Sequence, residues 1–229
     1  MTFLLILALR LIRGGISNPT DWIINHLLMM PAILVGLSLH EFGHAFVSDK
    51  LGDPTPRSQG RVTIDPRAHV DPMGLICLLF AGFGWGNPVQ VNPSYYKHRR
   101  RDEALVAIAG VTMNLIIALA STLITKAILE LAPDSFLYST AGGVVVDMLR
   151  YLISINIVLM VFNLLPVPPL DGFNLITQIF NLSQYSWYRE LYSKGGLILL
   201  LIILLGGTSY ILSPAVNFFY GIAIKILNM

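Results

Sequence analysis

The sequence is poor in charged residues. Of its 229 residues only 12% are Asp, Glu, Lys or Arg, about half the share of a typical soluble domain, whereas 55% are hydrophobic. A soluble globule of this length could not bury that much apolar surface. The apolar residues form long blocks without alternation, which argues against a lipid-facing barrel. We therefore predict an all-α membrane protein, a polytopic bundle of about 4–6 transmembrane helices.

Cysteine is almost absent. Cys77 has no second cysteine with which to pair, which excludes an internal disulfide. Because Cys77 lies in an apolar run, we expect a small side chain that is buried or faces lipid. The sequence also lacks internal repeats, low-complexity tracts and an appended soluble region. We therefore expect residues 1–229 to form a single integral-membrane domain.

The apolar blocks predict where the chain crosses the membrane. Residues 2–9 are too few for a straight span and have no basic residue before them, so we expect a partial or interfacial helix and no cleaved signal. Longer blocks predict spans at 21–44, 104–131, 144–165 and 197–229, the last broken at Gly206, Gly207 and Pro214. Aromatic residues typical of a membrane interface precede the last block, at Tyr185, Trp187, Tyr188 and Tyr192.

A polar segment and a short apolar segment separate the first two spans. Residues 50–72 contain many prolines and glycines and are expected to be mostly loop, with a short strand at 61–64. Residues 73–85 are apolar but too short to cross a bilayer. We expect this piece to be re-entrant, dipping into the protein and returning on the same side.

Basic residues indicate the orientation. The segments at 50–72 and 87–101 carry eight of the fifteen Lys and Arg residues. Such clusters mark cytoplasmic loops more often than nucleic-acid sites, so we expect no nucleic-acid partner and place these loops on the cytoplasmic face of the cell membrane. Two further crossings then return the chain to that side at Asp171.

A short motif at the end of the first span carries chemistry. His40 and His44 are four residues apart, so on a helix they lie on one face and can share a zinc ion. Glu41 projects about 100° round the helix from His40, beside the position where water would bind. The alternative, two histidines bonded to neighbouring helices with no metal, is less favoured because charged and metal-binding residue types are costly inside a membrane.

A catalytic zinc needs a third protein ligand. Asp171 follows the span at 144–165 directly, after a run with three prolines in four residues that prevents regular helical hydrogen bonding. It is therefore our candidate for the third ligand. In an alternative interpretation, Asp171 only caps the helix that begins at Gly172.

These motifs together resemble a known family. The histidine motif at 40–44, the segment Asn163-x-x-Pro-x-x-x-x-Asp171-Gly172 and the stretch from Ala109 to Asn114 are similar to those of the site-2 proteases, which are intramembrane zinc metalloproteases. The resemblance covers most of the chain. It implies a minimal form without the PDZ or CBS regions of larger relatives.

The resemblance also implies an activity, the hydrolysis of peptide bonds in or near transmembrane segments of substrate proteins. Its partners would be a membrane-protein substrate and the lipid bilayer. Glu41 would activate water, while Asn114 would either assist near the scissile carbonyl or only bond neighbouring helices. Asn163 is expected to be structural rather than catalytic. The implied ligands of one zinc ion per chain are His40, His44 and Asp171.

Other functions remain open at this stage. A membrane metal transporter would also place histidine and aspartate in a helical bundle, but we find neither two similar halves nor a series of such sites. A catalytically silent relative would not need Glu41. Short peptides at the membrane surface are a further possible substrate class. The ligand types would accept iron, cobalt or manganese as well as zinc.

Overall fold

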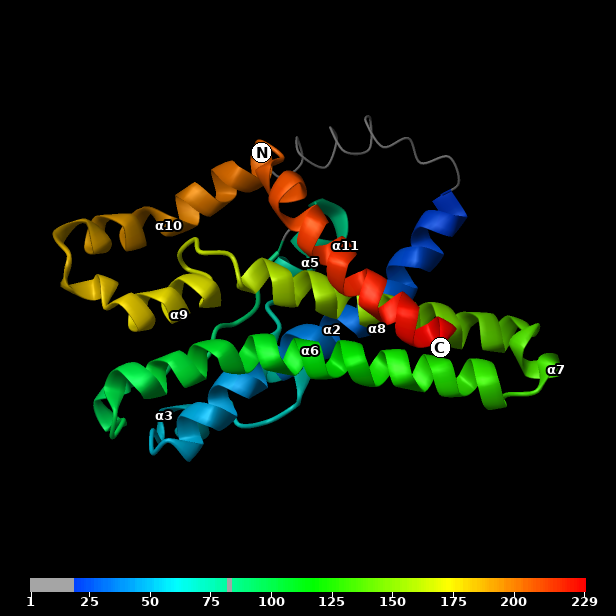
Figure 1. The fold of residues 1–229 in the computed structure, drawn as a ribbon, viewed down its shortest axis with the longest axis horizontal. Coiled ribbons are helices and arrows are strands. Elements are labelled where there is room, and N and C mark those ends of the chain that lie inside the picture. Colours follow the sequence, from blue (N-terminus) through cyan, green and yellow to red (C-terminus); the bar gives the residue numbers. More distant parts are fainter. Residues whose placement is uncertain (1–18, 82–83) are drawn as a thin grey trace.

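The computed structural model describes residues 19–81 and 84–229, and all the named secondary-structure elements in this part of the chain are helices (Figure 1). The predicted helix at 2–9 lies outside the described residues. Within these described residues, four helices are long and apolar enough to cross a membrane, which confirms the prediction of a polytopic helical protein. They are α2 (Pro19–Lys50), α6 (Arg99–Leu131), α8 (Thr140–Asn163) and α11 (Gly207–Asn228). Within α11, the candidate span covers Tyr210–Asn228.

Helices α2, α6 and α8 pack against one another and form the centre of the molecule, with α11 lying against α6 and α8 (Figure 1). Small residues allow the close approach. A Cβ atom on Gly43 of α2 would lie 2.7 Å from Met113 Cγ and 3.0 Å from the Ala109 carbonyl oxygen of α6. Since lipid tails are as apolar as the helices, close packing of this kind is what holds membrane helices together.

The polar segment after α2 contains two single-turn helices, α3 (Thr55–Ser58) and α4 (Pro66–His69), each with proline in its first turn. The short strand predicted at 61–64 was wrong. The Thr63 amide donates to the Arg61 carbonyl at 2.9 Å, which makes a tight three-residue turn in place of extended backbone. In the described part of the chain the only β-type pairing is an isolated bridge between Val70 and Gly86.

That bridge closes the re-entrant piece. The chain leaves at Val70, forms the ten-residue helix α5 (Pro72–Ala81) and returns to the same place at Gly86. The Asn87 amide then donates to the His69 carbonyl oxygen at 2.7 Å. The two ends of the piece are therefore adjacent, as expected for a segment that enters and leaves on the same side of the membrane. Cys77, on α5, is buried.

The remaining elements connect and cover the central helices: η1 (Pro93–Tyr95), α7 (Asp134–Leu137), α9 (Asp171–Phe180), η2 (Leu182–Gln184) and α10 (Ser186–Leu204). Helices α9 and α10 lie at the end of the molecule opposite α7 (Figure 1). The chain breaks between α10 and α11 at Gly206, whose φ of 74° suits glycine. The break predicted at Pro214 was wrong, because this proline lies inside α11. Membrane helices tolerate such prolines when neighbouring groups satisfy the freed carbonyl.

Candidate metal centre

His40 and His44 meet on the inner face of α2. Their Nε2 atoms lie 3.1 Å apart, and the two residues are only 5% and 9% exposed. The helical period explains this arrangement, because residues four apart are stacked one turn above the other. The structure thus brings the two histidines together as their spacing predicted.

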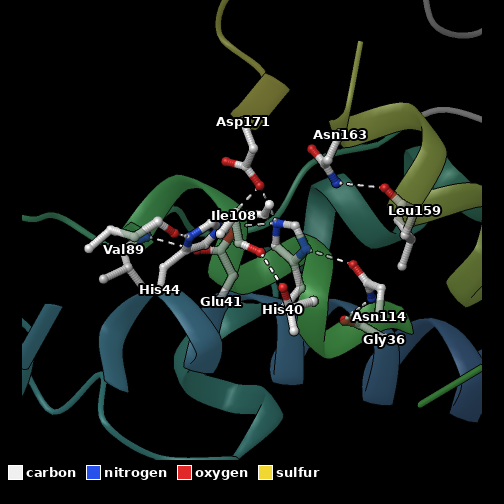
Figure 2. A network of polar contacts seen from close by, with 12 residues as sticks. Gly36, His40, Glu41, His44, Val89, Ile108, Asn114, Leu159, Asn163 and Asp171 are labelled. Atoms are coloured by element: carbon white, nitrogen blue, oxygen red, sulfur yellow. Dashed lines mark hydrogen bonds and ion pairs between the residues drawn. The ribbon is translucent and has the colours of Figure 1, made fainter. Parts of the chain in front are cut away.

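Asp171 reaches the same point from a distant part of the chain. Its Oδ2 atom lies 3.2 Å from the Nε2 atoms of both His40 and His44, and Figure 2 shows the carboxylate pointing onto the two rings. Asp171 is the first residue of α9, but its side chain does not cap that helix. The capping interpretation therefore does not describe the side chain, which faces the histidines instead.

Hydrogen bonds on the far side of each ring identify the nitrogen that carries the proton. His40 Nδ1 lies 2.7 Å from Asn114 Oδ1, and His44 Nδ1 lies 2.7 Å from the Val106 carbonyl oxygen. Both partners only accept hydrogen bonds, so each Nδ1 carries a proton, and in the neutral form of each ring the lone pair is then on Nε2 and faces inward. This is the form in which histidine binds a metal.

The donor set fits a bound cation. Two Nε2 lone pairs and Asp171 Oδ2 face one another at 3.1–3.2 Å, and this oxygen is buried with no hydrogen-bond donor. Three lone-pair atoms in this arrangement repel one another unless they share a positive charge. Tetrahedral zinc, with bonds of about 2.0–2.1 Å, places its ligand atoms roughly 3.3 Å apart. In the part of the chain that the structure describes, no other group of three such residues could hold a metal.

Glu41 lies beside this centre without being part of it. Its Oε2 accepts a hydrogen bond of 2.9 Å from the amide of Val89, in the segment that follows the re-entrant helix. Figure 2 shows the Glu41 side chain near His40 and His44, with Val89 close by. The carboxylate is thus held close to the metal ligands by a backbone donor.

A cleft of about 580 Å³ opens over these residues. One wall is α2, a second is the extended segment that carries Val89, and a third is formed by one face of α9 together with aromatic residues of α10. Besides the metal ligands and Glu41, the lining includes Val89, Val91, Asn163, Asn174, Gln178, Tyr188 and Tyr192. Of the aromatic residues expected at the membrane interface, Tyr188 and Tyr192 therefore face the site, whereas Tyr185 and Trp187 stack on each other.

Gly110 of α6 lies against the histidine rings. A Cβ atom at this position would be 2.7 Å from His40 Nε2 and would also collide with His44 Nε2. No side chain fits between α6 and the metal ligands, which accounts for the glycine in the Ala109 to Asn114 stretch. The sequence indicated that this stretch belonged to the site but gave no reason for the glycine.

Asn114 and Asn163 are placed differently. Asn114 is fully buried behind His40, and its amide group donates to the Gly36 carbonyl at 3.1 Å and to Asn156 Oδ1 at 2.9 Å. Both of its amide hydrogens are therefore used between helices. Asn163 lines the cleft, with its amide group donating to the Leu159 carbonyl of its own helix at 3.0 Å.

The remaining histidines bond to the backbone or lie apart from the cleft. His26 contacts the Trp22 carbonyl at 2.8 Å and His69 the Thr63 carbonyl at 2.7 Å. His98 precedes the first turn of α6. Among the described residues, none of these three histidines belongs to the group that could hold a metal.

Comparisons with known proteins agree with this geometry. Residues 28–203 match peptidase family M50. The chain is 35% identical over 185 residues to the candidate zinc metalloprotease YwhC of Bacillus subtilis. These aligned residues make up 81% of this chain and 84% of YwhC. It is 34% identical over 172 residues to the candidate zinc metalloprotease Rip2 of Mycobacterium tuberculosis, covering 72% of this chain and 62% of Rip2. None of the solved structures matches the chain.

Proposed function

The chain belongs to peptidase family M50, as its resemblance to the site-2 proteases predicted, and on this premise we propose that it is an intramembrane zinc metalloprotease. It hydrolyses peptide bonds in or near transmembrane segments of other proteins. One observation carries the proposal: a single cleft in a membrane-helix bundle presents three metal-ligand atoms and a separate carboxylate, that of Glu41. A site that only stores or transports metal has no need of that extra carboxylate.

The proposed metal ligands are His40, His44 and Asp171. A zinc ion held there would acidify water and polarise a peptide carbonyl. Glu41 takes the proton from the water that attacks the carbonyl carbon and delivers it to the leaving amide nitrogen as the C–N bond breaks. Because Val89 bonds Glu41 Oε2, the other carboxylate oxygen is left for this proton transfer.

We assign Asn114 a positioning role. Its contacts with Gly36, Asn156 and His40 use both amide hydrogens and the carbonyl oxygen. No hydrogen remains for a substrate oxygen, so Asn114 supports the orientation of His40 instead. This corresponds to the interhelical alternative of the sequence analysis.

We further propose that residues 88–93, called the strap below, hold the substrate in extended form. The backbone amides of Gln90 and Val91 have no hydrogen-bond partner within the described part of the chain, and Val91 lines the cleft. An extended peptide can pair with such unpaired backbone groups. A transmembrane helix would have to unwind before it could bind in this way.

The orientation is also part of the proposal. The re-entrant piece begins and ends beside the polar segment that follows α2, so the basic segments at 50–72 and 87–101 lie together. The positive-inside tendency then puts them at the cytoplasmic face of the cell membrane, with the cleft nearer that face.

The test is zinc content and cleavage measured on the same detergent-purified samples. We expect about one zinc per chain in both the unmodified protein and Glu41→Gln, with cleavage of single-span membrane substrates lost only in the variant. Cleavage that survives in Glu41→Gln would overturn the mechanism. Zinc bound by both proteins with cleavage by neither, across a panel of substrates, would favour a metal-binding role instead.

A further inference from the structure

A chain of buried hydrogen bonds runs through all three central helices and ends on a metal ligand. It begins at the Leu152 carbonyl of α8, which accepts from Asn156 Nδ2 at 2.8 Å. Asn156 Oδ1 accepts from Asn114 Nδ2 of α6 at 2.9 Å, and Asn114 Oδ1 lies 2.7 Å from His40 Nδ1 of α2. Both asparagines are fully buried.

Two backbone carbonyls, those of Leu152 and Gly36, fix the direction of the bonds in this chain. A backbone carbonyl only accepts, so Asn156 must turn its NH₂ group to Leu152 and its oxygen to Asn114. Asn114 must then donate to Asn156, and its second hydrogen goes to the Gly36 carbonyl. Only its oxygen is left for His40, which must therefore carry a proton on Nδ1, so the lone pair of the neutral ring is on Nε2.

We propose that Asn156 is a positioning residue that keeps His40 in the tautomer that binds metal. It touches neither the cleft nor the ligands. Without it, Asn114 is oriented by the Gly36 carbonyl alone, and a rotated amide would offer an NH₂ group to His40 Nδ1. The ring would then carry its proton on Nε2, which removes the lone pair that the metal requires.

The packing around Asn156 supports a dedicated contact. A Cβ atom on Gly36 would lie 3.2 Å from Asn156 Oδ1 and 2.8 Å from Leu159 Cδ1, so these two side chains of α8 occupy the space that a larger residue at position 36 would need. Two amides are thus brought together in an apolar helix junction. Buried amides destabilise a fold unless they are bonded, and helices can pack on apolar residues alone. Positioning of His40 gives these two residues a function.

The inference rests on the metal-ligand role that we propose for His40, and it is independent of any substrate. Its test is therefore the affinity for zinc, measured on purified protein by competition with a chelator, together with the visible spectrum of the cobalt-substituted site. Asn156→Leu has the same shape as asparagine without its polar atoms. Thr125→Val is the control, since Thr125 is buried on α6 and bonds only the Ser121 carbonyl of its own helix.

We expect Asn156→Leu to weaken zinc binding by roughly 10–100-fold and to alter the cobalt spectrum, with both unchanged in Thr125→Val. Asn156→Thr is a second variant, to be measured in case Asn156→Leu does not fold. Its hydroxyl can donate to the Leu152 carbonyl, as Thr122 donates to the Ala118 carbonyl, and still accept from Asn114. It should keep an affinity between those of the parent and the leucine variant.

Zinc affinity within twofold of the parent in a folded Asn156→Leu or Asn156→Thr protein, with an unchanged cobalt spectrum, would overturn the inference. An equal loss in Asn156→Leu and Thr125→Val would also overturn it, because packing alone would then explain the effect. If the proposed proteolytic function is wrong, the measurements give a different result. In that case the parent binds zinc tightly and cleaves nothing, and the variants still differ in affinity.

Discussion

The amide nitrogen of Val89 lies 2.9 Å from Oε2 of Glu41, although 48 residues separate them in sequence. The contact joins the strap to the carboxylate that we propose as general base. The strap is tied down on both sides of it, through the Asn87 amide on the His69 carbonyl at 2.7 Å and the Asn92 amide on Asp53 Oδ2 at 2.7 Å. A backbone donor on an anchored segment can therefore orient the base.

Replacing the donor tests this contact. Val89→Pro removes the amide hydrogen while keeping an apolar side chain, so Glu41 loses its hydrogen bond. Because hydrogen bonds to charged groups contribute about 1.5–3 kcal/mol, we expect the turnover number to fall roughly tenfold or more, with zinc content unchanged. Steady-state cleavage of a peptide substrate gives both the turnover number and KM.

Val91→Pro is the matched control, since the Val91 amide bonds nothing in the described residues and does not touch Glu41. There we expect a higher KM and a nearly normal turnover number, because only the substrate-pairing edge is changed. Unchanged turnover in Val89→Pro would show that the contact does not orient the base, and raised turnover would show that it holds the base back.

Asp171 is the third of the metal ligands that we propose. Asp171→Ala removes the carboxylate whose Oδ2 lies 3.2 Å from both histidine nitrogens, so we expect zinc affinity to fall by more than the roughly 10–100-fold that supporting residues contribute. Metal analysis after dialysis against a weak chelator measures this. Asp147→Ala, which alters an exposed carboxylate paired with Arg150, should keep its zinc. Equal metal content in the two variants would contradict the assignment.

Gly110 provides a test of space rather than of charge. In Gly110→Ala the added methyl group must displace the imidazole nitrogens of both histidines, so we expect loss of zinc and of cleavage. Gly143→Ala is the control, because a Cβ atom there meets nothing within 4 Å. The control should be as stable as the parent or more stable, since alanine favours helix over glycine by up to about 1 kcal/mol. Zinc content near one per chain in Gly110→Ala would contradict this expectation, because the two imidazole rings could then shift without losing the metal.

Much of this centre was predictable from the sequence. The positions of His40, Glu41 and His44 on a helix follow from the helical period alone. The arrival of Asp171 follows from the order of the elements, since two crossings after α2 return the chain to the same side. The re-entrant piece was predictable because an apolar run of its length cannot span a bilayer.

Other contacts had no sequence signal. The donor to Glu41 and the acceptor for His44 are backbone groups of Val89 and Val106, which every non-proline residue carries. The direction in which Asn114 faces depends on how far α6 is rotated about its axis, and that is decided by packing. The prediction of a strand near Thr63 was wrong for a related reason. A strand needs a second strand to pair with, and the sequence does not reveal whether one is present.

Asp53 forms a clamp that anchors the strap, through Asn92, to Ser48 at the end of α2. Asp53 is fully buried, and its carboxylate accepts from Ser48 Oγ at 2.9 Å, the Asn92 amide at 2.7 Å and the Thr55 amide at 2.9 Å. Burial alone would raise the pKa of Asp53. The hydrogen bonds from Thr55, Asn92 and Ser48 outweigh burial and hold this pKa below its ordinary value.

The sign of the pH dependence follows from this shift. A carboxyl group whose folded pKa is below its unfolded value, about 3.9, stabilises the fold fully above that value. The contribution is lost as the pH falls through the lower, folded pKa. We therefore expect part of the acid sensitivity of the protein below about pH 4 to disappear in Asp53→Asn.

At neutral pH the same substitution should lower the free energy of unfolding by about 2 kcal/mol, because an amide replaces one accepting oxygen by a donor facing other donors. Denaturant unfolding in detergent at several pH values measures both effects, and Asp147→Asn, on an exposed aspartate, is the control. If the clamp also places Val89, Asp53→Asn should reduce cleavage while zinc content stays near one per chain. Identical pH profiles for Asp53→Asn and the parent would show that the clamp does not act through the carboxylate charge.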